Sequence, residues 1–197
     1  MERVVVCHNP RMLSIRLAMI ASLLLFAACG KSDWPSEEER TLEQGHAPTP
    51  YTAAQIRDGC PSGRVCTFRI ESDGGFSIVK RYRYLEADDQ GVTIEASLEG
   101  SGPGGNQAPS KSRSNWRELQ RHASFPADST KISDQEVQTP AGTFQCMRYV
   151  VTTEEGGKTV VKYLDFAREL PGMPVRMTLE YDGKQISTKT LISHGAE

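Results

Sequence analysis

The side chains of this chain that could do chemistry are cysteines, histidines and a few paired carboxylates. After residue 28 the histidines are far apart, at His46, His122 and His194, so their spacing predicts neither a catalytic triad nor a metal cluster. The pairs Asp88-Asp89 and Glu154-Glu155 fall in expected hairpin turns, where solvated charge is the usual arrangement. The sequence therefore predicts a protein that is not an enzyme and that carries no metal and no cofactor.

The most informative residue is Cys29, which ends an apolar run. Residues 17–28 are apolar except for one serine, and three arginines precede them. A basic start, an apolar stretch and small residues at the break form the layout of a secretory signal. The run is shorter than the roughly 20 residues that a membrane-spanning helix needs. We therefore predict a signal peptide over residues 1–28, with Met12 as an alternative start.

The residues Leu25-Phe26-Ala27-Ala28-Cys29 resemble the lipobox of bacterial lipoproteins, in which Leu, two small residues and Cys follow in order. Here Phe26 takes the usual Leu position. The resemblance implies that the Cys29 thiol forms a thioether to a diacylglycerol carrying acyl chains such as palmitate. Each buried CH₂ contributes about 0.8 kcal/mol, so two or three chains would hold the protein firmly in a membrane. The expected place is the cell envelope, facing the periplasm.

The residues that follow Cys29 leave the choice of membrane open. Gly30 favours the outer membrane, because an Asp at that position would be a retention signal, whereas Lys31-Ser32 resembles inner-membrane retention signals. Both membranes remain alternatives at this point.

Composition predicts one domain on a tether. After cleavage, 20 basic and 24 acidic residues remain, a net charge of −4, which argues against a nucleic-acid partner. Residues 31–50 carry three consecutive glutamates, three prolines and few large apolar side chains, so they cannot fold alone. We expect an acylated cysteine with a disordered tether over residues 29–50 and a single domain over residues 51–197. Ser36 is available to cap a short helical turn within the tether.

The expected fold class is α+β, a mostly antiparallel curved sheet with one clear helix packed on it. Apolar and polar residues alternate over 92–99 and again over 175–181, which is typical of strands with one dry face. Glycine-containing turns separate such runs, so successive strands form a meander of hairpins. The eight predicted strands lie near residues 65–71, 76–86, 92–99, 131–138, 143–153, 158–166, 174–181 and 185–193.

The clear helix is predicted over residues 115–122. Trp116 and Leu119 share one face at helical spacing, Ser112 or Ser114 is the expected cap, and Pro126 follows the end. Residues 100–112 are glycine- and serine-rich and are interpreted as a loop. A second short helix is expected over residues 52–58.

Three cysteines remain after the leader and Cys29, in an oxidising compartment. A bridge between Cys60 and Cys66 across Pro61-Ser62-Gly63 is the simplest pairing and leaves Cys146 as a buried thiol in a strand. The alternative joins Cys66 to Cys146 and leaves Cys60 unpaired. The sequence alone does not choose between them.

Two groups of basic residues suggest different partners. Arg113, Arg117 and Arg121 are four residues apart, so an early helix start would align them into a stripe able to contact anionic lipid head groups, although a solvated helix face is the alternative. The run from Lys80 to Tyr84 interleaves basic and aromatic residues, as nucleic-acid-binding surfaces do. In a strand, however, the two tyrosines lie on one face and the two arginines on the other. We therefore expect the tyrosines to pack on the core and the arginines to be solvated.

The segments Thr139–Cys146 and Leu170–Val175 resemble turns of small uncharacterised envelope lipoproteins and of the curved-sheet lipoprotein-carrier group. Members of that group hold acyl chains between a concave sheet and covering helices. The resemblance implies a hydrophobic or lipidic ligand in the concavity of the sheet. Five aromatic residues are candidates for its wall, with an ordinary core as the alternative: Phe76, Tyr82, Tyr84, Trp116 and Phe144.

Taken together, these patterns predict a non-enzymatic, lipid-anchored envelope lipoprotein. Its partners are expected to be a membrane, through acylated Cys29, and a lipid or an envelope protein. The alternative function is a protein-interaction module, such as an accessory subunit or inhibitor in the periplasm. A dry pocket would favour the ligand, whereas a filled core with an exposed apolar patch would favour the protein partner.

Overall fold

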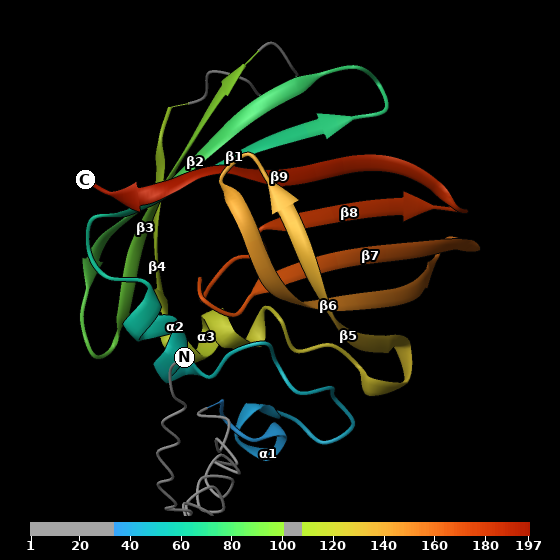
Figure 1. The fold of residues 1–197 in the computed structure, drawn as a ribbon, viewed down its shortest axis with the longest axis horizontal. Coiled ribbons are helices and arrows are strands. Elements are labelled where there is room, and N and C mark those ends of the chain that lie inside the picture. Colours follow the sequence, from blue (N-terminus) through green and yellow to red (C-terminus); the bar gives the residue numbers. More distant parts are fainter. Residues whose placement is uncertain (1–33, 101–107) are drawn as a thin grey trace, which may run out of the picture. The chain divides into compact units, whose positions relative to one another are not determined.

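The computed structural model describes residues 34–100 and 108–197, so the predicted signal peptide and Cys29 lie outside the described residues. Within these ranges the strands form one antiparallel sheet, which confirms the predicted fold class (Figure 1). The strands are β1 Arg64–Ser72, β2 Ser77–Ala87, β3 Gly91–Gly100, β4 Ser110–Asn115, β5 Thr130–Thr139, β6 Gly142–Glu155, β7 Lys158–Ala167, β8 Arg176–Tyr181 and β9 Lys184–Ala196.

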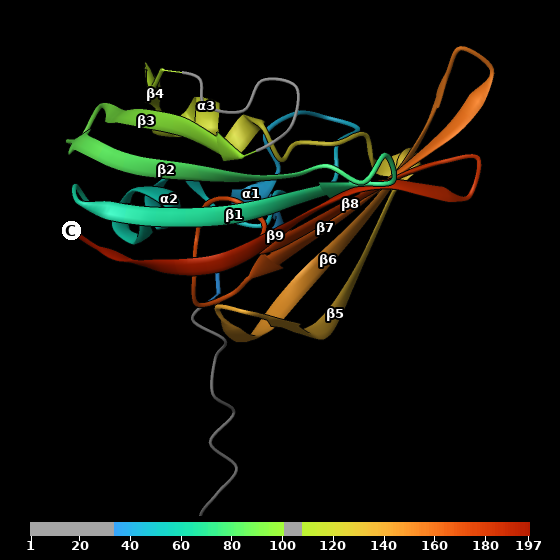
Figure 2. The ribbon, with the colours of Figure 1, turned by 90° about the horizontal axis from the view of Figure 1, so that it is seen from above.

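The sheet consists of two meanders rather than the single meander that was predicted. The strand order is β4-β3-β2-β1-β9-β8-β7-β6-β5, which can be followed from one edge to the other in Figure 2. The chain reaches one edge at β4, returns at the opposite edge as β5, and runs inward until β9 pairs with β1. This central pairing, between strands that are far apart in sequence, could not be inferred from the hairpin turns.

Strand β4 occupies part of the segment that we interpreted as a loop. Its residues are all polar and show no alternation, because β4 is an edge strand whose only strand neighbour is β3. Ser112 lies opposite Ile94 and Arg113 lies opposite Thr93 in this pairing. Backbone hydrogen bonds to β3, rather than burial of apolar side chains, therefore place this strand.

The helices are α1 Glu37–Arg40, α2 Ala53–Gly59 and α3 Trp116–Arg121, followed by a short 3-10 turn at Ala127–Ser129. Each of the three α-helices starts with a capping box, a reciprocal pair of side-chain and backbone hydrogen bonds. The predicted cap of the main helix was wrong, since Asn115 rather than Ser112 or Ser114 fills that place. The side chain of Asn115 accepts a hydrogen bond from the Glu118 backbone N–H at 2.8 Å, and the Asn115 backbone N–H donates to the Glu118 carboxylate at 3.0 Å.

The two faces of the sheet differ, and we call the face that packs against α2 and α3 the inner face. A first core on this side joins Ile56 of α2 and Trp116 of α3 to strand residues such as Tyr84, Tyr149 and Phe166. The Trp116 ring nitrogen donates to the Asp88 carbonyl at 2.8 Å, which ties α3 to the β2–β3 turn. No helix in the described ranges is long and apolar enough to cross a bilayer.

A second core lies where the start of β6 approaches β1 and β9. It combines Cys66 and Phe68 of β1 with Leu191 of β9 and Phe144 of β6. The ring of Phe144 is 6.0 Å from that of His194, although these residues are on strands that are not neighbours in the sheet. The sheet is therefore curved enough for the β5–β6 hairpin to cover part of the inner face (Figure 1).

Residues 34–50 do not form the solvated tether that we predicted. Arg40 is buried and its Nη1 donates to the Thr49 carbonyl at 2.7 Å, while the Thr49 hydroxyl donates back to the Arg40 carbonyl at the same distance. Trp34 packs edge-on against Tyr51 with ring centroids 6.1 Å apart. Hydrogen bonds within the segment and two aromatic rings hold it on the domain, although it contains few aliphatic residues.

We predict that Arg40→Ala lowers the free energy of unfolding by about 2 kcal/mol, because it leaves buried carbonyl oxygens without their donor. Urea denaturation followed by circular dichroism measures the change. Arg57→Ala is the matched control, since Arg57 is exposed and its side chain pairs with its neighbour Asp58. Equal stability of the Arg40 variant and the parent protein would show that the segment contributes nothing to the folded domain.

Candidate functional site

Part of the inner face belongs to neither core. Residues that lie directly opposite each other in an antiparallel pair point to the same face. Ile70 lies opposite Ile78 on one side and Lys189 on the other, and Leu98 lies opposite Lys80. Leu179 lies opposite Lys162 in the second meander. We call this set the inner patch, and it consists of Ile70, Ile78, Lys80, Leu98, Lys162, Leu179 and Lys189.

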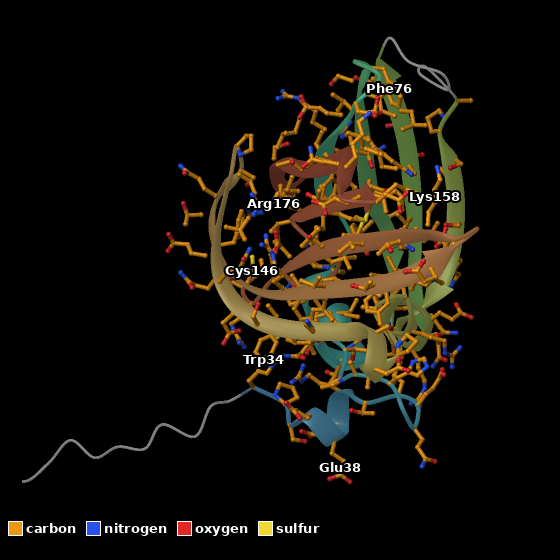
Figure 3. The ribbon with its side chains drawn as sticks, turned by 90° about the vertical axis from the view of Figure 1, so that its right-hand side faces the viewer. Trp34, Glu38, Phe76, Cys146, Lys158 and Arg176 are labelled. Carbon is orange, nitrogen blue, oxygen red and sulfur yellow. The ribbon has the colours of Figure 1, made fainter. Side chains whose placement is uncertain are left out.

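The apolar members of the inner patch are half-buried but do not join either hydrophobic cluster. They come from β1, β2, β3 and β8, so strands of both meanders contribute. Figure 3 shows the sheet from the side of its hairpin ends, with Phe76 of the β1–β2 turn near the top of the view and Trp34 and Glu38 toward the bottom. The sheet therefore presents apolar side chains on its inner face beyond the cores that stabilise it.

Lys189 is the least usual residue of the inner patch. Its Nζ lies 4.2 Å from the centroid of the Phe68 ring and 4.8 Å from that of Tyr82, a cation–π arrangement. The same atom is 3.4 Å from the Tyr82 hydroxyl and 3.9 Å from the sulfur of Met173. Burial lowers the pKa of Lys189 below its ordinary value, because desolvation disfavours the charged form.

The inner patch carries positive charge that no carboxylate offsets within residues 34–100 and 108–197. Lys80, Lys162 and Lys189 form no ion pair there. Lys80 instead places its Nζ 5.0 Å from the centroid of the Tyr82 ring, so two ammonium groups share one aromatic ring.

The outer face shows the opposite arrangement. Arg83 pairs with Glu95 and Glu197, at 3.0 and 2.8 Å. Arg148 and Arg176 both bind Asp165, whose side chain is 1% exposed, at 2.7 and 3.0 Å. Several cations of the outer face therefore have carboxylate partners, whereas the three lysines of the inner patch have none in the described ranges. Arg69 on the outer face of β1 also forms no ion pair there.

The five predicted wall residues do not form one wall. Tyr84 and Trp116 lie in the first core, Phe144 lies in the second, and Tyr82 is partly buried against the second core. Phe76 lies in the β1–β2 turn and joins neither cluster. Of the five, Tyr82 is the residue that contacts the lysines of the inner patch.

The predicted stripe of three arginines was wrong in its geometry, because α3 begins only at Trp116. Arg113 is in β4, where it pairs with Asp88 at 2.6 Å, and Arg121 pairs with Glu43 at 3.6 Å. Arg117 is exposed on α3 and lines an open cavity of 290 Å³ between α2, the β2–β3 turn and α3. Contact of these arginines with lipid head groups stays a prediction.

The cysteines do not pair as predicted, since Cys60, Cys66 and Cys146 are all unbonded and buried. Arg64 Nη1 donates to the Cys60 sulfur at 3.0 Å and to the Pro171 carbonyl at 2.6 Å, so it joins the end of α2 to the loop before β8. Cys60 faces this loop, whereas Cys66 belongs to the second core with Cys146. Cys146 is a buried thiol in β6, as expected from the pairing of Cys60 with Cys66, although that bridge itself is not formed.

Burial raises the pKa of the Cys60 thiol and raises that of Cys146 to about 12. Both side chains are therefore protonated at neutral pH, the less nucleophilic form. In the part of the chain that the structure describes, no cluster of three or more His, Cys, Asp or Glu side chains could hold a metal ion.

Comparison with known proteins finds no family model and no curated protein that matches this chain. Two solved structures are similar at 15% sequence identity. One is a Bacteroides fragilis protein described as exported and as having a YmcC-like fold, with a TM-score of 0.45 over 68% of this chain and 96% of its own. The other is a Parabacteroides distasonis protein described as a lipoprotein, with a TM-score of 0.46 over 69% and 96%. Similarity at this level says nothing about a ligand or partner of this chain.

The sequence analysis missed the three lysines of the inner patch, although one signal for them was present. The alternation Ile78, Lys80, Tyr82 places Lys80 on the face that we assigned to the core. A core-facing position in a strand is expected to be apolar, so a lysine there departs from the expected pattern. Such departures are found at functional sites. Alternation likewise places Lys189 on the same face as Leu191. Its contacts with Phe68 and Tyr82 could not be predicted, however, because these aromatic residues lie on other strands.

We predict that Lys189→Met raises the free energy of unfolding at pH 7 by about 1 kcal/mol, because methionine has no charge to desolvate. The lowered pKa means that the folded state binds this proton more weakly than the unfolded state does. The free energy of unfolding of the parent protein should therefore increase as the pH rises from the pKa of Lys189 in the folded state toward the ordinary lysine pKa. The Lys189→Met variant should not show this increase. Urea unfolding at several pH values measures both effects.

The matched control is Lys184→Met, because Lys184 is exposed at the β8–β9 turn and pairs with Asp73 at 2.9 Å. It should leave the pH profile between neutral pH and the lysine range close to that of the parent. A Lys189 variant that unfolds more easily than the parent at pH 7 would mean that the aromatic contacts outweigh the desolvation cost.

Proposed function

We propose that this chain is a lipid-anchored, periplasm-facing envelope lipoprotein whose sheet binds a hydrophobic ligand on the inner patch. The anchor rests on the resemblance of the residues around Cys29 to a lipobox. The ligand rests on one observation, namely that aliphatic side chains of the inner face lie outside both cores. Covering such a surface with an apolar ligand is favourable by about 25 cal/mol for each Å² removed from water.

The surroundings of the inner patch suit a preformed site. The strands that carry it are paired on both sides, since β2, β1, β9 and β8 are all internal strands of the sheet. Side chains of the first core pack on these strands next to the helices. Side chains of the second core pack on them beneath the β5–β6 hairpin. A ligand would therefore meet a surface that is already ordered, which reduces the entropic cost of binding.

A protein-interaction module has weaker support. Ile132 of β5, at 42% exposure, is the one large apolar side chain exposed within the described ranges. A single exposed side chain of this kind is common in monomeric proteins and does not mark an interface. The inner patch offers a ligand four half-buried aliphatic side chains, whereas the exterior offers a protein partner this one exposed side chain within the described ranges.

For the anchor, Cys29→Ser should move the protein from the membrane fraction to the soluble fraction and abolish incorporation of labelled palmitate, because a hydroxyl cannot form the thioether. Cys7→Ser is the control, since Cys7 precedes the predicted cleavage site and should be removed with the signal peptide. Fractionation and labelling of cells that express each variant test this. Palmitate label retained by the Cys29 variant would refute the anchor.

For the ligand, Ile78→Gln should weaken binding of dodecanol to the non-lipidated Cys29→Ser protein by about tenfold, because an amide replaces apolar contact surface. Val79→Gln is a matched control, because it is the next residue of β2, is also half-buried and lies on the outer face opposite Arg69 and Glu99. Titration calorimetry measures both affinities. Equal losses in the two variants, or no dodecanol binding by the parent, would contradict the inner patch as the site.

A further inference from the structure

We propose that the ligand is an amphipathic anion, an acyl chain that ends in a carboxylate or a phosphate, and that its anionic group binds at Lys80, Tyr82 and Lys189. This inference rests on the proposed function and names the class of ligand for the same site. It follows from the charge, burial and hydrogen bonding of these three side chains.

The first argument is charge. Two ammonium groups lie near one ring, with Lys80 Nζ 5.0 Å and Lys189 Nζ 4.8 Å from the Tyr82 centroid, and neither forms an ion pair with a described carboxylate. Bringing cations into a partly desolvated site is unfavourable unless an anion accompanies them. The surrounding side chains, Phe68 and Met173, offer a ring face and a thioether instead. An anion from a ligand would supply the missing partner.

The second argument is hydrogen bonding. The contact between Lys189 Nζ and the Tyr82 hydroxyl, at 3.4 Å, uses the lone pair of that hydroxyl and leaves its proton free to be donated. Lys80 and Lys189 each retain donor capacity, because an ammonium group has three hydrogens. The donor groups of Lys80 and Tyr82 on β2 therefore lie close to that of Lys189 on β9, above the intervening strand β1 on the inner face. Charge-assisted hydrogen bonds to a carboxylate or phosphate are about twice as strong as neutral ones.

The third argument is the direction in which apolar residues continue. Lys189 lies opposite Ile70, and Ile70 lies opposite Ile78, so an aliphatic row starts beside the cationic group. Both isoleucines are closer along their strands to the β1–β2 turn than Phe68 and Lys80 are. A head group at the lysines would therefore place an acyl chain against this row, which crosses β9, β1 and β2 on the side of Phe68 that is closer to the β1–β2 turn.

Another basic location is less suitable for this ligand. The open cavity between α2 and α3 contains Arg57 and Arg117, but Asp89 also lines it and Arg57 pairs with Asp58 at 3.0 Å. A carboxylate ligand would compete there with the carboxylates of the protein. The lysines of the inner patch have no such competitor in the described ranges.

The test is calorimetric titration of the non-lipidated Cys29→Ser protein with four amphiphiles that share a twelve-carbon chain, each below its micelle concentration. They are dodecanoate, monododecyl phosphate, dodecanol and dodecyltrimethylammonium. We expect the tighter-binding anion to exceed dodecanol in affinity by at least tenfold and the cation to bind most weakly. Dodecanoate as the tighter anion would indicate a fatty acid, and the phosphate would indicate a phospholipid-like ligand.

The variant that isolates the head-group contact is Lys189→Met, which keeps an unbranched side chain only one heavy atom shorter and removes its charge. It should reduce the affinity for the preferred anion about tenfold and the affinity for dodecanol by much less, because dodecanol carries no charge that depends on the ammonium group. Lys162→Met is the matched control, since Lys162 is also an unpaired lysine of the inner patch but lies opposite Leu179. A thermal melt of each variant verifies folding, and Lys80→Met provides a second removal of charge at the same group.

The outcomes separate the two proposals. If dodecanol and the anions bind equally and Lys189→Met changes nothing, the anionic head group is refuted while binding of a hydrophobic ligand stands. If Lys162→Met reduces anion binding as much as Lys189→Met, the general positive charge of the face explains the preference and the proposed head-group site is refuted. If none of the four amphiphiles binds, the proposed function itself fails.

Discussion

The pairing of β1 with β9 is the contact on which the rest of the domain depends. It joins two antiparallel meanders that would otherwise be separate sheets, and its register places Phe68 opposite Leu191 and Ile70 opposite Lys189. The inner patch crosses this junction, with Ile78 and Lys80 contributed by one meander and Lys189 and Leu179 by the other. Such a pairing closes a loop of more than a hundred residues, and its cost in chain entropy is offset by the β1–β9 ladder itself and by the two cores on its flanks.

The two faces of the sheet differ in the partners of their charged side chains. On the outer face, several charged side chains form pairs, including two arginines that hold the buried carboxylate of Asp165. On the inner face, short helices and the β5–β6 hairpin cover two regions and leave the inner patch between aromatic residues and unpaired lysines. A domain selected for stability alone would be expected to have a partner or an apolar residue in place of Lys189. This arrangement is the basis on which we propose a ligand that brings its own negative charge.

Much of the fold could be predicted because its signals are local. Alternation located eight strands to within a few residues, and the run from Lys80 to Tyr84 separated into an inner tyrosine face and an outer arginine face as expected. Predictions that depended on distant partners were wrong. The segment from Trp34 to Pro50 looked too polar to fold, but Arg40 satisfies carbonyl groups of its own segment and Trp34 packs on Tyr51. The cysteine pairing and the arginine stripe required contacts and a helix start that no local pattern specifies.

The sequence by itself determined the local elements, through period-two alternation and through three capping boxes that each need only residues three apart. It also supports the anchor at Cys29, because a lipobox is recognised as a linear motif. Only the tertiary structure decided which side chains share a face across β1 and β9. Lys189 and Tyr82 are 107 residues apart in the chain, and their contact follows from strand register, a property of the whole sheet and not of either segment.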